Sequence, residues 1–337
     1  MNIIKVMIKH LIYTNSNYLQ INRICSLFRR NSYCVILAYH RVSPLNDRDY
    51  LLREMIVDPV SFEKQMLFLI KNYTVVSLNK FLGILECDRN QSNYAVITFD
   101  DAYLDSYEYA FPILKKYNLS ATIFVPTDFI ETGRHFWWDR LANILVSSNK
   151  QSLLLNWKDK RYNLKIGGNV FTIKAFKKLC YLFKFARNKE KEGLLNLVSK
   201  NLNVVETNSY PSNLTWRNIR EMSQNNISFG AHTHTHSAVS SVSDSEFKEE
   251  LLSPKETLEN RLNQAITAFA YPYGEKSDFN IQSVNAIKQL GYKVALTMIQ
   301  RPIISNDDLF VLPRIGIGGY DTEEIFRLKL SGSIPLF

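Results

Sequence analysis

The chain has 337 residues, 46% of them hydrophobic, which is enough for one barrel-sized core with an insertion. Its net charge is +9, from 41 basic and 32 acidic residues. Lys5, Lys9 and His10 interrupt the N-terminal apolar residues, which argues against a membrane-spanning helix and a secretory signal. The four cysteines show no paired or metal-ligand spacing, so free thiols in a reducing, cytoplasmic compartment are expected. No nucleic-acid motif and no phosphate-binding glycine loop is present.

Residues 1–33 contain no acid and five basic residues between apolar ones, which predicts a basic arm that caps the fold or anchors it to a surface. From residue 34 to 337, apolar runs alternate with helical patterns, as in parallel βαβ units. Strands are predicted at 35–39, 74–77, 95–99, 121–126, 227–231, 266–271 and 293–296, and helices at 59–72, 78–85, 103–117, 215–224, 244–263 and 279–290. This order predicts an α/β fold, a distorted parallel (β/α) barrel with a helical insertion at about 134–211.

Two neighbouring carboxylates, Asp100 and Asp101, come directly after a buried apolar run. Like charges this close repel, so a bound cation or a division of roles would justify them. Since α/β barrels carry their active sites at the carboxyl ends of strands, the pair is a candidate site. The alternative is a helix N-cap with an acidic first turn, because a helical pattern follows.

A second apolar run ends in three histidines, His232, His234 and His236. Neutral imidazoles beside a carboxylate form divalent metal sites, and two histidines with one carboxylate leave positions open for water and substrate. The four-residue spacing of His232 and His236 predicts one side of a helical turn, with His234 a bystander. A polar loop explains one histidine better than three.

Three motifs, Thr98-Phe99-Asp100-Asp101, His232-Thr233-x-x-His236 and Ala270-Tyr271-Pro272-Tyr273-Gly274, resemble in this order those of the polysaccharide deacetylase family of carbohydrate esterases, the NodB homology domain. The resemblance covers about 35–319. It implies a metal-dependent hydrolase that removes acetyl groups from a sugar in a polysaccharide or a lipid-linked glycan. It further implies that Asp100 is the general base, that Asp101, His232 and His236 bind the metal, and that the Pro272–Tyr273 turn stabilises the oxyanion. Zinc is the first expectation, and iron, cobalt or nickel suit the same ligands.

The chain departs from this family twice. Ala270 stands where many members have an Arg that partners the base, and Arg314 is the candidate replacement. No histidine follows His236 to serve as the general acid. His40, at the end of the first predicted strand, resembles the catalytic histidine of circularly permuted deacetylases of exopolysaccharide export. The alternative is an ordinary histidine at a strand end.

The block Phe136-Trp137-Trp138-Asp139-Arg140 opens the predicted insertion. Its aromatic residues, Trp138 among them, form either a platform for a sugar ring or part of the core, and the sequence favours neither. Asp139 is a candidate partner for His40. The block resembles one found in a subgroup of the family that is often met in glycan biosynthesis.

Residues 150–200 contain thirteen basic and three acidic residues. Within them Ile173, Phe176, Leu179, Cys180 and Phe183 recur at helical spacing between lysines. A basic amphipathic helix of this kind predicts peripheral binding to the anionic inner face of the membrane, suited to a lipid-linked substrate. The alternative is a helix that packs this stripe on the barrel and exposes its lysines.

Other functions stay open at this point. A barrel that lacks the usual Arg and C-terminal His could be a catalytically impaired glycan-binding module, and the acetyl group could be O-linked. Paired Asp residues also serve glycosidases, but the histidine pair argues against that chemistry, which needs two separated carboxylates.

Overall fold

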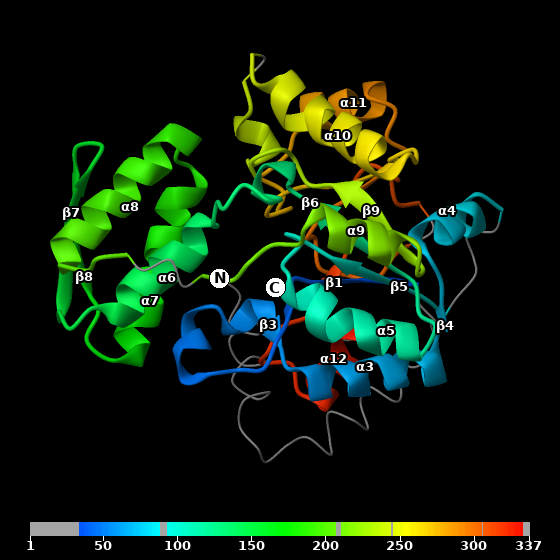
Figure 1. Ribbon diagram of the computed structural model, residues 1–337, viewed down its shortest axis with the longest axis horizontal. Helices are drawn as coiled ribbons and strands as arrows, with labels where there is room; N and C mark the ends of the chain where they lie inside the picture. Colours follow the sequence, from blue (N-terminus) through cyan, green and yellow to red (C-terminus); the bar gives the residue numbers. More distant parts are fainter. Residues whose placement is uncertain (1–33, 88–92, 207–209, 244, 305, 333–337) are drawn as a thin grey trace.

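The computed structural model describes residues 34–87, 93–206, 210–243, 245–304 and 306–332, so the predicted basic arm lies outside the described residues. Its centre is one parallel sheet in the order β11-β10-β9-β6-β5-β1-β12, with β4 paired to β5 (Figure 1). The strands are β1 (Val35–Tyr39), β4 (Thr74–Val75), β5 (Tyr94–Phe99), β6 (Ala121–Val125), β9 (Ile227–Ala231), β10 (Ala268–Ala270), β11 (Val294–Leu296) and β12 (Ile315–Gly316). This curled sheet confirms the predicted distorted (β/α) barrel.

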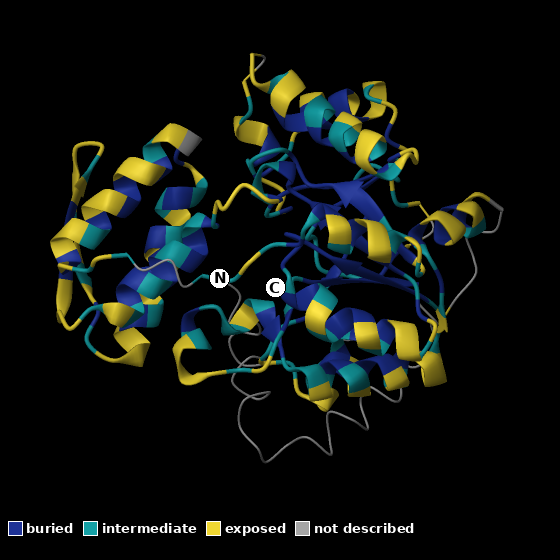
Figure 2. Cartoon of the chain, viewed as in Figure 1, coloured by how far each residue is buried: buried dark blue, intermediate teal, exposed yellow. Residues whose placement is uncertain are grey.

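The strands are buried on both faces, as parallel strands between helices are. All residues of β1 and β6 are buried, and the sheet is the darkest part of Figure 2. The six helices α3, α5, α9, α10, α11 and α12 all pack against one face of the curled sheet, where their buried side chains form a single core cluster with Leu37, Ile97 and Ile123 (Figure 1). The opposite face carries Ile36, Val96 and Phe124, which form a second cluster with α4. A short parallel pair, β2 (Arg41–Val42) with β3 (Ile56–Val57), follows β1.

The barrel helices are α3 (Pro59–Asn72), α4 (Leu78–Cys87), α5 (Phe111–Lys116), α9 (Trp216–Ser223), α10 (Ser253–Leu262), α11 (Ile281–Gln289) and α12 (Glu323–Leu330). The predicted start of α3 is confirmed, because Asp58 caps its first turn and Pro59 occupies the first helical position. The prediction for 103–117 was wrong at its start. A turn follows the two aspartates, and α5 begins only after a π-helical segment, Ser106–Ala110.

A separate lobe, at the left of Figure 1, lies within the predicted insertion. It consists of α6 (Trp137–Ser147), the hairpin β7 (Ser152–Trp157) and β8 (Lys160–Lys165), α7 (Asn169–Lys184) and α8 (Asn188–Leu202). Phe176, Leu179 and Phe183 of α7 are buried in the core of this lobe. The apolar stripe of α7 therefore packs inside the protein, which was the alternative to a stripe that faces a membrane. The described part of the chain holds no helix of the length and apolarity that crossing a bilayer requires.

Candidate active site

Side chains at the carboxyl ends of three strands converge on one cavity of about 240 Å³. His40 follows β1, Asp100 and Asp101 follow β5, and His232 follows β9. The cavity is lined by His40, Leu51, Leu52, Glu54, Met55, Asp100, Asp101, Trp137, Trp138, Phe176, Cys180, His232, His236, Tyr273 and Met298. The structure thus brings together seven of the residues that the sequence analysis selected, at the barrel face where catalysis is expected.

Asp101, His232 and His236 offer three ligand atoms that lie within 4.8 Å of one another. Oδ1 of Asp101 lies 3.1 Å from Nε2 of His236 and 3.7 Å from Nε2 of His232. That Oδ1 is buried and has no hydrogen-bond partner among the described residues, a costly state for a carboxylate without a cation. The three donors therefore fit a divalent metal ion that keeps open coordination positions.

The ring of His232 is oriented for this role by the backbone. Its Nδ1 lies 2.7 Å from the carbonyl oxygen of Ala270, so Nδ1–H donates there and the lone pair of Nε2 faces Asp101. Burial lowers the pKa of His232 to about 4, so the imidazole is neutral near pH 7, as a metal ligand must be.

The loop that carries the histidines is not the helical turn predicted from their spacing. Thr233 and His236 both have left-handed backbone conformations, with φ of 58°. Buried Glu250, which precedes α10, accepts hydrogen bonds from the backbone N–H groups of His234 and Thr235 at 3.1 and 3.0 Å. This carboxylate satisfies donors that a helix would have paired internally, so the loop closes around Glu250. Sequence reasoning missed Glu250, because no motif marks it.

Backbone strain is concentrated beside the cavity. Asp101 and Ala102 have φ of 71° and 54°, conformations that cost a non-glycine residue about 1–3 kcal/mol. A segment before α9 holds this turn in place. Asn213 Nδ2 donates to the carbonyl of Asp101 at 3.0 Å, and the N–H of Leu214 donates to that of Ala102 at 2.8 Å. The strained turn presents both aspartates to one cavity.

Arg314 holds Asp100 from within the core. Two of its nitrogens each lie 2.7 Å from one carboxylate oxygen of Asp100, and its Nε donates to the carbonyl of Thr297 at 3.0 Å. Burial alone would raise the pKa of Asp100, but the charge of Arg314, together with His232 and the hydrogen bonds, outweighs it and lowers that pKa well below its usual range. Asp100 is therefore a fixed, ionised carboxylate, and Arg314 supplies the charge that Ala270 cannot.

The turn at Pro272 and Tyr273 forms another wall. Pro272 is buried, and the ring of Tyr273 meets that of His236 edge-on at 5.0 Å. Tyr273 has a φ of 60°, and its backbone N–H donates to no other described group. A backbone donor without a partner beside a reaction cavity is what stabilisation of an oxyanion requires.

The predicted contact between His40 and Asp139 was wrong, because no hydrogen bond or ion pair joins them in the described structure. Asp139 instead accepts a hydrogen bond from Tyr103 Oη at 2.8 Å, and Trp138 Nε1 donates to the same hydroxyl at 2.7 Å. Asp139 therefore faces Tyr103 and lies outside the lining of the cavity that Trp138 lines. Burial raises the pKa of Asp139 to about 7, although Arg41 opposes this.

The Phe-Trp-Trp block serves the core and the cavity wall together. Phe136 is buried and stacks on Trp138 at 4.4 Å, and Trp138 meets His236 edge-on at 4.8 Å. Trp137, which sequence reasoning did not select, also lines the cavity, and its Nε1 donates to Tyr273 Oη at 3.3 Å. The aromatic block in the sequence indicated Trp137 as a candidate. The sequence did not show how the helix is rotated, and this rotation decides where the side chain of Trp137 points.

Comparisons with known proteins agree with this fold and site. Residues 88–155 and 183–295, more than half of the chain, match the family model described as Polysaccharide deacetylase. YxkH of Bacillus subtilis strain 168, which carries the name of a polysaccharide deacetylase, is 22% identical over 284 residues, which are 84% of this chain and 70% of that protein.

Two solved structures share the fold. Streptococcus pyogenes deacetylase PplD in complex with acetate has a TM-score of 0.60 and 22% identity, over 89% of this chain and 99% of that one. IcaB from Ammonifex degensii has a TM-score of 0.54 and 16% identity, over 90% of this chain and 98% of that one. Because the family model matches more than half of the residues, this chain belongs to the polysaccharide deacetylase family.

Proposed function

We propose that this protein is a metal-dependent deacetylase that hydrolyses the N-acetyl group of a sugar in a polysaccharide or a lipid-linked glycan. One observation carries the proposal. Asp100, which is ionised and paired with Arg314, lines the same cavity as His40. The three possible metal ligands, Asp101, His232 and His236, line this cavity too. A base, a set of metal donors and an acid are the groups that metal-assisted amide hydrolysis needs.

Asp101, His232 and His236 would hold the divalent ion, with zinc the first choice and iron, cobalt or nickel compatible with the same donors. Such an ion would supply Lewis-acid polarisation of the acetyl carbonyl.

Residues of the protein carry out the proton transfers and stabilise the oxyanion. Asp100 takes a proton from the attacking water as the new C–O bond forms. The N–H of Tyr273 stabilises the negative charge that develops on the carbonyl oxygen. His40 gives a proton to the sugar nitrogen as the C–N bond breaks, so acetate and a free amine leave.

The contacts of the described residues weigh against the alternatives. The case for an impaired glycan-binding module rested on a missing Arg and a missing His. The pairing of Arg314 with Asp100 and the position of His40 in the cavity lining support these two residues as the replacements. A proton donor favours the amide over the ester, because an amine leaves poorly without protonation. Glycosidase chemistry is disfavoured since one of the two adjacent carboxylates is bound at both oxygens by Arg314.

Release of acetate from N-acetylated sugar oligomers tests the proposal. We expect acetate and free amine in equal amounts, loss of both after chelation, and recovery when a divalent metal is restored. No acetate from the metal-loaded protein would refute the proposal. Release of reducing ends would indicate a glycosidase, and acetate from O-acetylated sugars alone would indicate an esterase.

Substitution of His40 and of His234, one at a time, should distinguish a catalytic histidine from a structural one. His40→Ala is expected to lower turnover by about 10²–10⁴-fold, the usual contribution of a general acid. His234→Ala should be mild, because the side chain of His234 lies outside the cavity lining and contacts Thr127 Oγ1 at 2.9 Å. Steady-state acetate release with metal content measured in parallel checks this. Equal losses in both variants with metal retained would leave His40 without a catalytic role.

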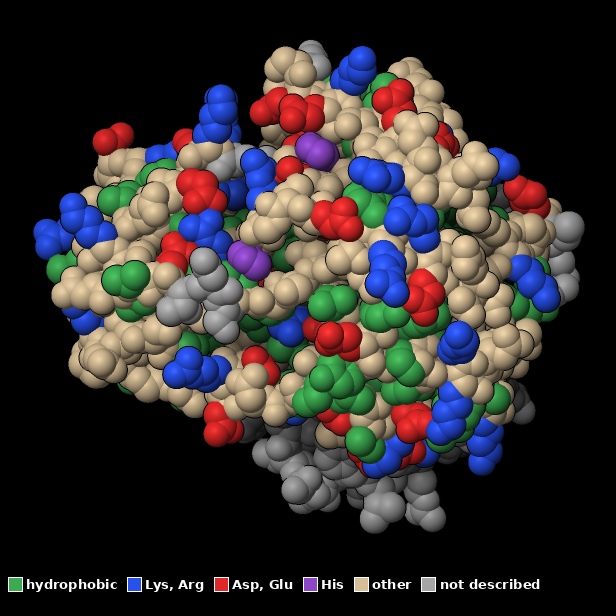
Figure 3. Space-filling model, in the orientation of Figure 1, with side chains coloured by type: hydrophobic (Ala, Val, Ile, Leu, Met, Phe, Trp, Pro, Cys, Tyr) green, Lys and Arg blue, Asp and Glu red, His purple; other side chains and the backbone are tan. Residues whose placement is uncertain are grey.

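Peripheral binding to the inner membrane face is the remaining part of the proposal. The predicted apolar stripe of α7 is buried, so the support that remains is the lysines of this helix and its exposed apolar side chains Val170, Phe171 and Tyr181. Basic and acidic side chains intermingle on the face in Figure 3, so we expect weak binding to anionic vesicles that high salt abolishes. Co-sedimentation with anionic and neutral vesicles is the measurement. Indifference to lipid charge would contradict membrane binding.

A further inference from the structure

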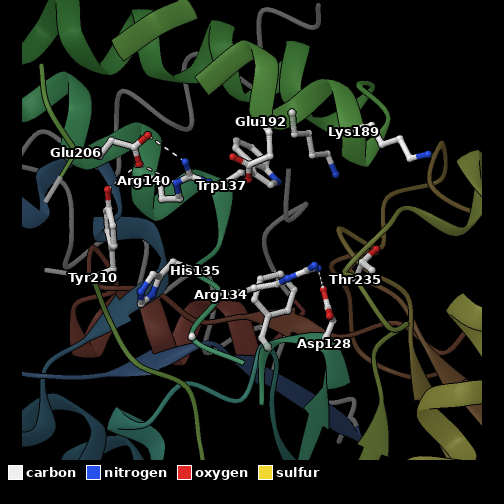
Figure 4. Close-up of a pocket in the computed structure, with 13 residues that line it drawn as sticks. Asp128, Arg134, His135, Trp137, Arg140, Lys189, Glu192, Glu206, Tyr210 and Thr235 are labelled. Carbon is white, nitrogen blue, oxygen red and sulfur yellow. Dashed lines mark hydrogen bonds and ion pairs between the residues drawn. The ribbon is translucent and has the colours of Figure 1, made fainter. Parts of the chain in front are cut away.

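A second cavity of about 690 Å³ adjoins the first, between the insertion lobe and the barrel. Trp137 lines both cavities, so they are neighbours across one side chain. Figure 4 shows residues of α6 and α8 on one side of this second cavity, and Asp128 and Arg134, which follow β6, on the other. We propose that it binds the saccharide units next to the sugar that loses its acetyl group. This inference rests on the proposed function, which it extends from one sugar to a chain.

Polar groups in this cavity are held in fixed directions by one another. Arg140 donates to the carboxylate of Glu206 through Nε at 2.8 Å and Nη2 at 3.0 Å, and to Glu192 through Nη1 at 2.6 Å. Tyr210 Oη donates to the same Glu206 at 2.8 Å. Carboxylates and a guanidinium fixed in this way present acceptors and donors to hydroxyl groups without an ordering cost at the time of binding.

Aromatic rings complete the lining. The rings of His135 and Tyr210 lie 4.8 Å apart, and Trp137 stacks on Phe183 at 4.8 Å. Nδ1 of His135 is buried and has no hydrogen-bond partner among the residues described. Flat apolar faces beside hydrogen-bonding groups match a sugar ring, which has both kinds of surface.

The charges that line the cavity nearly balance, which decides between a neutral and an anionic occupant. Four cations and three anions are present: Arg134, Arg140, Lys189 and Lys191 against Asp128, Glu192 and Glu206. Arg134 is ion-paired with Asp128, and Arg140 with the two glutamates. Lys191 lies in the field of the buried Glu250, so the excess over the whole lining is small, whereas a site for a phosphate would present several cations to the ligand. The lining therefore fits uncharged saccharide units.

The test is the dependence of kcat/KM on chain length, measured as acetate release by the metal-loaded full chain from β-linked N-acetylglucosamine oligomers of one to five units. We expect the wild type to prefer the pentamer to the monomer. His135→Ala should lower the pentamer-to-monomer ratio roughly tenfold, the equivalent of one or two hydrogen bonds. Tyr210→Phe, which keeps the ring and loses the hydroxyl, should lower it less. Arg161→Ala, an exposed substitution on β8 outside the cavity lining, is the matched control and should keep the ratio.

A binding measurement separates this inference from the proposed function. Oligomer binding to an Asp100→Asn variant, followed by calorimetry, does not need turnover. We expect the pentamer to bind more tightly than the monomer, and we expect this difference to disappear when His135→Ala is added. That result would support saccharide binding in the second cavity even if no acetate were released. Equal losses for monomer and pentamer in His135→Ala, or no length dependence in the wild type, would overturn it. Thermal unfolding of each variant identifies any that fold poorly. If His135→Ala folds poorly, the length dependence of binding by Tyr210→Phe takes its place in the test.

Discussion

Asp100→Asn is expected to lower turnover by about 10²–10⁴-fold while the metal content of the protein stays at its wild-type level. The amide has the shape of the carboxylate but cannot accept the proton of water at neutral pH. Asp100 is not among the three residues whose ligand atoms cluster, so its loss leaves that donor set complete. Acetate release and metal analysis on the same preparation give both quantities.

Asp101→Ala is the matched comparison, and it should lose metal and turnover together. Its Oδ1 is the buried carboxylate oxygen nearest both histidines, and two imidazoles alone bind a divalent ion weakly. Metal loss in Asp100→Asn with metal retained in Asp101→Ala would reverse the two roles. Both variants should be assayed below their unfolding transitions, because Asp100→Asn also leaves the Arg314 charge without its partner.

Arg314→Met should lower the free energy of unfolding by about 3–5 kcal/mol, the usual cost of removing one partner of a buried ion pair. Arg314 is fully buried and makes both hydrogen bonds to Asp100 in parallel, so the carboxylate would remain in the core uncompensated. Urea unfolding at neutral pH gives the value. The double variant Arg314→Met with Asp100→Asn removes both charges and should recover part of the loss. Additive losses in the double variant would show that the pair is not coupled.

The pH dependence of this effect has a defined sign. Arg314 lowers the pKa of Asp100 in the folded protein, so the pair stabilises fully above the unfolded value of about 3.9 and loses its contribution as the pH falls through the folded pKa. In Arg314→Met, burial has lost the largest influence that opposes it, so the pKa of Asp100 rises and protonation stabilises the variant as the pH falls. The stability difference between wild type and variant should therefore shrink in acid. A difference that stayed constant between pH 7 and 4 would contradict the pairing.

The sequence alone determined the strands and the residues that end them. A buried parallel strand is a short apolar run whatever its neighbours are, so β1, β5 and β9 were readable locally. The polar residues that follow them, His40, Asp100 and His232, therefore had to reach one face of the barrel, because parallel strands all end on the same side. The fold class and the position of the candidate site follow from this regularity.

Side-chain partners between distant elements were decided by the tertiary structure. Arg314 meets Asp100 across 214 residues, which depends on how β12 pairs with β1 in the finished sheet. Glu250 shapes the histidine loop from a different helical segment, and that contact replaced the helical turn that spacing had suggested.

The aromatic block shows the same limit within one helix. Its composition indicated a role near the site, but the rotation of α6 against the barrel directs Trp137 and Trp138 to the cavity and Asp139 away from it, toward Tyr103. The second cavity exists only because the insertion lobe packs against the barrel. Local patterns report which residues are buried, whereas the partners of buried polar groups depend on packing geometry, which no single segment contains.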